Sequence, residues 1–325
     1  MAKITFEKLY KVSGSSLYSI LVRLAYFNNW YVDYNPESLV LGEMRQNSYN
    51  SIMGDISLFD LVVHHTRWDR SFLESNYKSD FSIIILRDPV DTFESIFHYV
   101  ELPKFYNVSN FQEFLQKLET GNVTDSLSIN PHGRAFGRNQ HSWSLGLDKQ
   151  YYENETAVLQ LISKMESKFD LVLMTEYFDE SVALLRTLLG GPLTHYLFQK
   201  ENERLNETKY RLSKQERIKL QNWLKADMMV YNHFLKKFST KLSPKIQSSA
   251  QELRKLNKLL ENYCQMKKNK IDVHEHLNNF ENLKLVHRDN NRSNLYCSHY
   301  GTPTKEKIRA AVKNFEEVKR LFSKG

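Results

Sequence analysis

The run Phe81–Leu86, Phe-Ser-Ile-Ile-Ile-Leu, constrains the fold more than any other stretch of the chain. It is short, apolar and rich in β-branched residues, and apolar and polar positions do not alternate along it. Such strands are buried on both faces, which is typical of parallel sheets covered by helices. Shorter apolar runs at residues 4–8, 60–65 and 170–174 are separated by amphipathic stretches. The sequence therefore predicts an α/β fold with a parallel sheet flanked by helices.

Helix-start signals and apolar periodicity predict the remaining elements. The predicted helices cover residues 15–28, 69–77, 89–100, a stretch opened by a capping box at 109–112, 155–168, 179–189, 213–238, 250–264 and 304–322. Residues 120–150 and 270–300 are predicted loops. Ser213 and Glu216 form a second capping box, and the helix after it is expected to turn four side chains to the core: Ile218, Leu220, Trp223 and Leu224.

An anion site is expected between the first strand and the first helix, in Lys8-Leu9-Tyr10-Lys11-Val12-Ser13-Gly14-Ser15-Ser16. Gly14 lets the backbone turn where a Cβ would clash, and Ser15 or Ser16 can cap the helix. The N–H groups and dipole of the helix start, with the Lys11 ammonium, attract a multiply charged anion. The nucleotide-triphosphatase motif is not matched, because Lys11 precedes the glycine. An ordinary helix start with an exposed lysine is the alternative.

Polar residues follow four of the predicted strands. Lys11 follows the first strand, His65 the second, Arg87 the third and Glu176 the fourth. Ligands of parallel sheets bind beyond the carboxyl ends of the strands. We therefore expect these four side chains to meet at one edge of the sheet.

The chemistry of two of these residues suits transfer of an anionic group. Arg87 and Ser95, two turns along the next helix, could hold one phosphate; the alternative is an ion pair of Arg87 with Asp88 or Asp91. His65, with an ordinary pKa near 6.5, suits a general base for a sugar hydroxyl, although a histidine at a strand end is often structural. Two tryptophans could stack on a sugar or simply pack in the core: Trp68 and Trp143.

The positive charge of the chain, +7 overall, arises from its C-terminal part, where residues 241–325 contain 18 Lys and Arg against 9 Asp and Glu. We predict one domain over residues 1–240 and a basic, mostly helical extension over 241–325. A solvated helical face explains this charge, and the basic residues are not interleaved with stacking aromatics, so no nucleic-acid partner is expected. Cys264 and Cys297 lie in the extension, either bridged or as free thiols.

Several features bear on compartment and metal use. The sequence contains neither 18 consecutive apolar residues nor a signal-peptide core, so neither a membrane span nor a secretory signal is predicted in it. Five N-x-[ST] sequons favour a lumenal setting: Asn107, Asn122, Asn154, Asn206 and Asn291. Histidine, cysteine and acidic residues do not show metal-ligand spacing, so no metal is expected.

Taken together, these stretches resemble the galactose-3-O-sulfotransferase family. The resemblance runs from about residue 3 to Cys264 and covers these segments in the family's order: Leu9-Tyr10-Lys11-Val12-Ser13-Gly14-Ser15-Ser16, His64-His65-Thr66-Arg67-Trp68, Arg87-Asp88-Pro89-Val90-Asp91-Thr92-Phe93-Glu94-Ser95, Gly137-Arg138-Asn139 with Gly146-Leu147-Asp148, Glu176-Tyr177-Phe178-Asp179-Glu180-Ser181 and Tyr231-Asn232-His233-Phe234. As a set these motifs are specific.

The resemblance implies a P-loop-like sulfotransferase fold and transfer of a sulfuryl group from 3′-phosphoadenosine 5′-phosphosulfate (PAPS), without a metal. The acceptor would be the 3-hydroxyl of a terminal β-galactose on a galactosylceramide-like glycolipid or a glycan. Lys11 and its loop (Ser13, Gly14, Ser15, Ser16) would hold the 5′-phosphosulfate, Arg87 with Ser95 the 3′-phosphate, and His65 would accept the hydroxyl proton. Acceptor contacts are expected from Trp68, Arg138, Asn139 and Glu176.

We call residues 8–16 the donor loop, and three of its residues depart from the family pattern. Tyr10 and Val12 replace His and Thr beside the lysine, and Ser13 replaces Ala. Loss of one hydroxyl donor predicts weaker donor binding, since a neutral hydrogen bond contributes about 0.5–1.5 kcal/mol. The family's N-terminal anchor is not part of this sequence, so residence at the lumenal side of the Golgi membrane is expected from the resemblance alone. The alternatives are a sulfotransferase for another glycan hydroxyl, such as a uronic acid 2-O position, and a catalytically silent carbohydrate-binding relative.

Overall fold

The computed structural model describes residues 3–30, 32, 60–64, 67, 77–124, 127–129, 135–198 and 210–269. Its centre is a four-stranded sheet with the order β2-β1-β3-β6, in which every pair of neighbours is parallel. The strands are β1 (Ile4–Glu7), β2 (Leu61–His64), β3 (Phe81–Leu86) and β6 (Leu171–Met174). The predicted parallel sheet is confirmed, and three of its strands are one or two residues shorter than predicted.

The register brings the carboxyl ends of the strands to one edge of the sheet. Glu7 at the end of β1 lies opposite His64 at the end of β2 and opposite Ile84 of β3. Leu86 at the end of β3 lies opposite Met174 at the end of β6. The segments that follow β1, β3 and β6 therefore start from the same edge.

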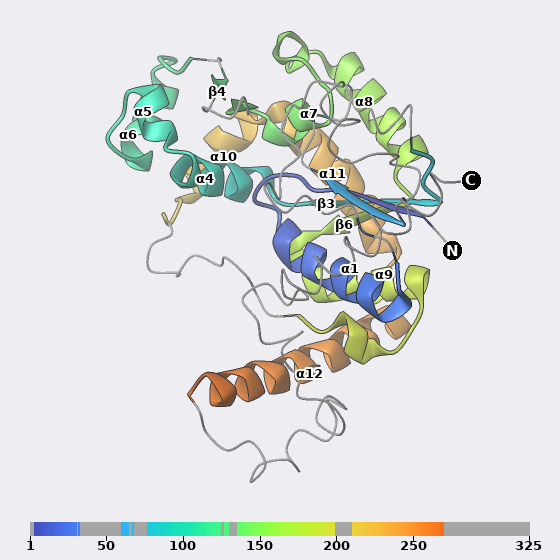
Figure 1. Cartoon of the computed structure of the whole chain (residues 1–325). Helices are drawn as coiled ribbons and strands as arrows, with labels where there is room; N and C mark the ends of the chain where they lie inside the picture. Colours follow the sequence, from blue (N-terminus) through green and yellow to red (C-terminus); the bar gives the residue numbers. More distant parts are fainter. Residues whose placement is uncertain are drawn as a thin grey trace, which may run out of the picture.

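Helices cover both faces of the sheet (Figure 1). On one face lie α1 (Gly14–Asn28) and α9 (Phe178–Leu189), and α12 (Pro244–Lys268) packs against α9. The other side holds α7 (Gln140–Ser144), α8 (Glu155–Lys168) and α11 (Lys225–Thr240). This arrangement confirms the predicted α/β fold with helices on both faces.

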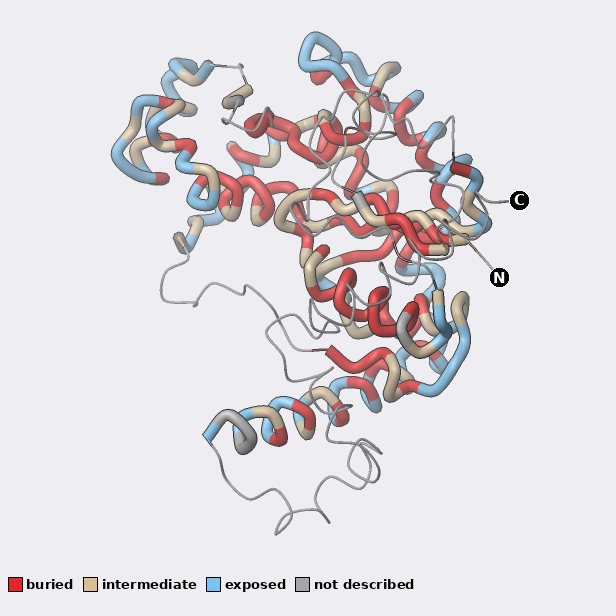
Figure 2. The backbone as a smooth tube through the Cα atoms, in the orientation of Figure 1, coloured by how far each residue is buried: buried red, intermediate tan, exposed pale blue. Residues whose placement is uncertain are grey.

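The main core follows the sheet, as the buried segments in Figure 2 show. Ile83, Ile84 and Ile85 of β3 are all fully buried. Because successive side chains of a strand point to opposite faces, burial of all three requires cover on both sides of the sheet. Side chains of α1, α9, α11 and α12 belong to the same hydrophobic cluster.

A second hydrophobic cluster lies beside the sheet and is rich in aromatic residues. It is built by α4 (Pro89–Tyr99), α5 (Leu102–Tyr106), α6 (Phe111–Glu119) and α10 (Lys214–Trp223). The ring of Phe93 lies 5.0 Å from that of Trp223 and 5.2 Å from that of Phe114, measured between centroids. This cluster fixes α4, the helix that follows Arg87.

The predicted loop at residues 120–150 is wrong. This region contains β4 (Ser128–Ile129), which pairs antiparallel with β5 (Ala135–Phe136), then α7 and the 3-10 helix η3 (Lys149–Tyr151). Strands of two residues and a five-residue helix are too short to give a detectable period in the sequence. They form because long-range contacts hold them, as shown below for α7.

The single helix predicted over 213–238 is also wrong, because Leu224 interrupts it between α10 and α11. The backbone there has φ −94° and ψ 34°, and its buried side chain joins the second cluster while α11 packs on the first. Ser213 and Glu216 do form the predicted capping box. Ile218, predicted to face the core, is 46% exposed.

Several helix ends differ from the predictions. Asn110, not Ser109, caps α6, and its side chain accepts a hydrogen bond from the Glu113 N–H. The first helix begins at Gly14, so Ser15 and Ser16 lie inside its first turn. The helix predicted over 250–264 is longer in the structure, where α12 begins at Pro244 and ends at Lys268. Apart from residue 77, the predicted helices 69–77 and 304–322 lie outside the described residues, as does the loop at 270–300.

Two further observations concern α12 and the described part as a whole. Cys264 on α12 is disulfide-bonded, and Cys297, the other cysteine of the chain, lies outside the described residues. None of the described helices is both long and apolar enough to cross a membrane. The remaining described elements are the 3-10 helices η4 (Thr175–Tyr177) and η5 (Leu193–Tyr196).

Candidate functional site

The loop between β1 and α1 has an unusual backbone. Lys11 and Ser13 both have φ of 60°, whereas Val12 between them does not have a positive φ. Left-handed conformations are uncommon for residues other than glycine and cluster at functional sites. Successive residues of opposite hand form a nest of N–H groups that suits an anion. Here the nest leads directly into the N-terminus of a 15-residue helix.

Gly14 is not the residue that turns this loop, since its φ is not positive. A Cβ on Gly14 would lie 2.8 Å from Cγ of Lys8. The glycine is therefore needed for the close approach of the Lys8 side chain, and Lys11 and Ser13 make the turn. The predicted anion loop is present, but its shape has a different origin.

The Lys11 ammonium lies 4.4 Å from the ring centroid of Tyr99, at the end of α4. Tyr99 is 63% exposed, and Ser95 precedes it by four residues, which places the two on the same side of the helix. Sequence reasoning did not select Tyr99, although its spacing from Ser95 was a usable signal. An exposed aromatic ring thus lies against the lysine of the predicted anion site, on the side of α4 that carries Ser95.

Arg87 contacts the donor loop directly: its Nη1 donates a hydrogen bond to the carbonyl oxygen of Lys11, at 2.9 Å. The alternative partners considered for Arg87 are occupied by another arginine. Arg217 of α10 lies 2.7 Å from Oδ2 of Asp88 and 2.9 Å from Oδ1 of Asp91. Arg87 therefore belongs with Lys11 at the edge of the sheet.

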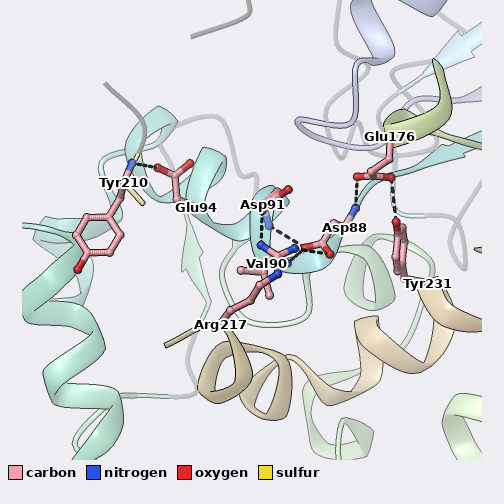
Figure 3. A network of polar contacts seen from close by, with 8 residues as sticks. All are labelled: Asp88, Val90, Asp91, Glu94, Glu176, Tyr210, Arg217 and Tyr231. Atoms are coloured by element: carbon pink, nitrogen blue, oxygen red, sulfur yellow. Dashed lines mark hydrogen bonds and ion pairs between the residues drawn. The ribbon is translucent and has the colours of Figure 1, made fainter. Parts of the chain in front are cut away.

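Glu176 links two elements, as Figure 3 shows. Its Oε1 accepts a hydrogen bond from the Asp88 N–H at 2.7 Å, and its Oε2 accepts one from the Tyr231 hydroxyl at 3.0 Å. The neighbouring Thr175 donates its hydroxyl to the Val12 carbonyl at 2.8 Å. Both carboxylate oxygens of Glu176 thus have protein partners.

Arg138 and Asn139 are buried and bonded to protein groups. Nε of Arg138 donates to the Trp223 carbonyl at 2.6 Å, and the guanidinium pairs with Glu153. The side-chain oxygen of Asn139 accepts from the Asp227 N–H at 3.0 Å. The acceptor contacts expected for Arg138 and Asn139 stay predictions; in the structure Arg138 bonds to the end of α10, and Asn139, at the start of α7, bonds to α11.

His141, which sequence reasoning missed, lies near the predicted site. It is 1% exposed, and neither ring nitrogen has a hydrogen-bond partner in the part of the chain that the structure describes. Burial lowers the pKa of His141, Asp227 acts in the opposite direction, and Arg87 and Asp88 are close enough to act on it as well. The imidazole is therefore neutral at pH 7.

His65 and Trp68 lie outside the described residues, so their predicted roles stay predictions. Arg67, between them, is buried: its Nε donates to the Trp143 carbonyl at 2.8 Å and its Nη2 lies 2.9 Å from Oδ1 of Asp148. Its guanidinium also lies 5.2 Å from the Trp143 ring. Trp143 thus has a packing partner, which favours the packing alternative for this tryptophan.

Comparison with known proteins gives a family for this arrangement. A family model described as Galactose-3-O-sulfotransferase matches residues 1–283. Galactosylceramide sulfotransferase of Mus musculus is 29% identical over 278 residues, covering 80% of this chain and 63% of the relative. The protein of the same name from Homo sapiens is 29% identical over 255 residues, covering 74% and 57%.

A relative with a different name is equally similar. Galactose-3-O-sulfotransferase 2 of Mus musculus is 28% identical over 253 residues, covering 74% of this chain and 63% of the relative. The chain thus spans less than two thirds of the length of each of these relatives. The family model nevertheless covers most of this chain, including every residue of the site described above. The chain therefore belongs to the galactose-3-O-sulfotransferase family.

Proposed function

We propose that the chain transfers a sulfuryl group from PAPS to the 3-hydroxyl of a terminal β-galactose on a glycolipid or glycan. The observation that supports this most is the donor loop, in which Lys11 opens a nest that leads into a helix start and gives its backbone carbonyl to Arg87 at the edge of the sheet. In-line transfer of an anionic group requires positioning and charge stabilisation rather than covalent chemistry. A lysine, an arginine and backbone N–H groups can supply both.

PAPS has two anionic ends, and the site offers a separate group of hydrogen-bond donors for each. Lys11 and the N–H groups from Ser13 to Ser16 bind the 5′-phosphosulfate and stabilise charge that builds on the leaving phosphate. Arg87 and Ser95 bind the 3′-phosphate. A guanidinium has five N–H donors, and the contact of Arg87 with the Lys11 carbonyl uses one of them.

His65 is the proposed general base for the acceptor hydroxyl, and Trp68 is the proposed sugar contact. The family membership supports both roles. The position of β2 also supports them, because this strand ends at His64 on the same edge of the sheet as the donor loop. Arg138, Asn139 and Glu176 shape the site through their protein contacts in this proposal. The galactosylceramide-like acceptor and the lumenal Golgi membrane are proposals of the same kind, supported by the relatives' names and the five sequons.

The test is transfer of labelled sulfate from PAPS to galactosylceramide and to lactose. Lys11→Ala, Arg87→Ala and His65→Ala are each expected to lose about 100-fold or more in kcat/KM, the usual cost of removing a charge-stabilising donor or a general base. Lys258→Ala is the matched control, because this lysine is exposed on α12 and pairs with Glu261, one turn away on the same helix. Full activity in all three site variants overturns the assignment.

Two outcomes lead to other conclusions. Nucleotide binding with transfer to uronic acid acceptors, and none to galactosides, overturns the acceptor but not the reaction. A chain that binds glycan but not the product 3′-phosphoadenosine 5′-phosphate (PAP) in calorimetry is a silent relative. The replacement of a donor-loop Thr by Val12 makes this calorimetric control necessary.

A further inference from the structure

Two consecutive residues of η4, directly after β6, contact two different segments of the proposed donor site. Thr175 donates its hydroxyl to the Val12 carbonyl in the donor loop. Glu176 accepts a hydrogen bond from the Asp88 N–H in the turn that carries Arg87. The start of η4 therefore contacts both segments that would hold the nucleotide.

The carbonyl contacts orient the donor loop. Arg87 holds the Lys11 carbonyl at 2.9 Å, and Thr175 holds the Val12 carbonyl at 2.8 Å. In a trans peptide unit the carbonyl oxygen and the next N–H point in opposite directions. The N–H groups of Val12 and Ser13 are thus turned away from Arg87 and Thr175, toward the other side of the loop. The two carbonyl contacts thereby direct two backbone N–H donors away from Arg87 and Thr175.

Glu176 positions the start of α4. The carboxylate of Asp88 is already used, since it accepts from the N–H groups of Val90 and Asp91 and pairs with Arg217. The N–H of Asp88, the residue directly after Arg87, bonds to Glu176 instead (Figure 3). Loss of this carboxylate would leave that N–H without its acceptor and release the turn that aims Arg87.

Tyr231 of α11 orients Glu176. Its side chain is mostly buried, and its hydroxyl donates to Oε2 of Glu176 at 3.0 Å. Burial and the Glu176 charge raise the pKa of Tyr231, so the hydroxyl keeps its proton and remains a donor at neutral pH. With one oxygen held by Tyr231, the other oxygen of Glu176 faces Asp88.

We infer that Thr175, Glu176 and Tyr231 form a brace, a set of positioning residues that holds the donor loop and the Arg87 turn in the geometry that binds the nucleotide. The inference rests on the proposed function, because the brace acts on the same donor site. None of the three is assigned to the reacting atoms.

The test measures the Kd of PAP by calorimetry, the KM and kcat for PAPS, and the melting temperature without nucleotide. Tyr231→Phe and Thr175→Val are each expected to raise the Kd of PAP and the KM for PAPS about 10-fold, the cost of one hydrogen bond with a charged or buried partner. The kcat at saturating PAPS is expected to change less. Thr175→Ser keeps the hydroxyl and should restore wild-type binding.

Tyr210→Phe is the matched control for Tyr231→Phe. Its hydroxyl also bonds to a glutamate at 3.0 Å, but that residue, Glu216, belongs to the capping box of α10. This control should bind PAP as the wild type does. If Tyr231→Phe melts far below the wild type, Thr175→Val against Thr175→Ser still decides the question, because the first replaces the hydroxyl by a methyl group at a half-buried site and the second keeps the hydroxyl.

The outcomes separate the inference from the proposed function. A wild-type chain that binds PAP, with Thr175→Val and folded Tyr231→Phe binding it equally well, overturns the brace alone. A wild-type chain that does not bind PAP overturns the proposed function, and the brace with it. Weaker PAP binding in Thr175→Val, restored in Thr175→Ser, supports both.

Discussion

At the scale of single residues, Asp227 and His141 show how a buried charge organises a short helix. One Asp227 oxygen accepts from the His141 N–H at 3.0 Å, and the other from the Ser142 N–H and hydroxyl at 2.7 and 2.6 Å. The two N–H groups belong to the first turn of α7, where backbone N–H groups have no partner within their own helix. A carboxylate from α11 therefore caps a helix that its own five residues would not stabilise.

Asp227→Ala should lower the free energy of unfolding by about 3 kcal/mol, because three buried donors lose a charged acceptor. Chemical denaturation measures the loss. Glu252→Ala, an exposed site on α12, is the control and should stay within about 0.5 kcal/mol of the wild type. Equal stability of the two variants would contradict the capping role.

His141 gives a pH prediction. Burial is the main cause that lowers its folded-state pKa from 6.5. The charge of Asp227 opposes this, and Arg87 lowers the pKa and Asp88 raises it by smaller amounts. A lowered pKa means that the unfolded chain binds more protons, so the contribution to stability is present above pH 6.5 and is lost as pH falls through the folded-state pKa. His141→Leu should therefore lose less stability than the wild type between pH 7.5 and 5.5. Denaturation midpoints at both pH values measure the difference, and parallel losses would exclude this contribution.

At the scale of elements, α4 is held at two points. Arg217 from α10 pairs with Asp88 and Asp91 at its start, and further along the helix Phe93 is buried among the aromatic side chains of the second cluster. The helix that carries Ser95 and Tyr99 is thus fixed by α10 from outside the sheet. Packing in the second cluster should therefore determine where one side of the donor site lies.

Phe93→Ala should lower the free energy of unfolding by about 3–5 kcal/mol, the usual cost of removing a buried aromatic ring. Phe93 is 1% exposed, whereas Leu159 on α8 is 56% exposed. Leu159→Ala, the control, should change stability by less than about 0.5 kcal/mol. Urea denaturation compares the two, and a small loss in Phe93→Ala would show that the cluster adjusts to the cavity.

At the scale of the whole molecule, α12 belongs to the same hydrophobic core as the sheet. Ile246, Ala250, Leu253 and Leu260 are buried in the main cluster, and Arg254 pairs with Asp179 and Glu180 at the start of α9. The Arg254 side chain is about half exposed, so these ion pairs contribute little; the apolar face of α12 contributes more. The boundary predicted at residue 240 stays a prediction, although side chains beyond it pack with those before it.

Leu253→Ala should lower the free energy of unfolding by about 2–5 kcal/mol, since the side chain is fully buried. If α12 and the sheet unfold together, the loss appears as a shift of one cooperative transition followed by both near- and far-ultraviolet circular dichroism. Gln251→Ala, exposed on the same helix, should leave that transition in place. A separate early transition of the helical signal would instead show that α12 unfolds on its own.

Features with a local cause could be predicted from the sequence. The β-branched run of β3 predicted burial on both faces, the Ser213–Glu216 spacing predicted a capping box, and the position of Arg87 after a strand predicted its place at the edge of the sheet. Each depends on residues a few positions apart. The break at Leu224 and the helix α7 could not be predicted this way, because distant packing partners cause them.

The sequence by itself determined the parallel sheet, the order of its flanking helices and the residues that lie at its carboxyl edge, since burial patterns and backbone preferences act over a few residues. Only the tertiary structure decided the shape of the donor loop and the partners of Glu176. The Thr175 hydroxyl and the Val12 carbonyl are 163 positions apart along the chain, and Tyr231 and Glu176 are 55 apart. Such pairs meet only once helices have packed on the sheet, because a hydrogen bond requires atoms within about 3 Å.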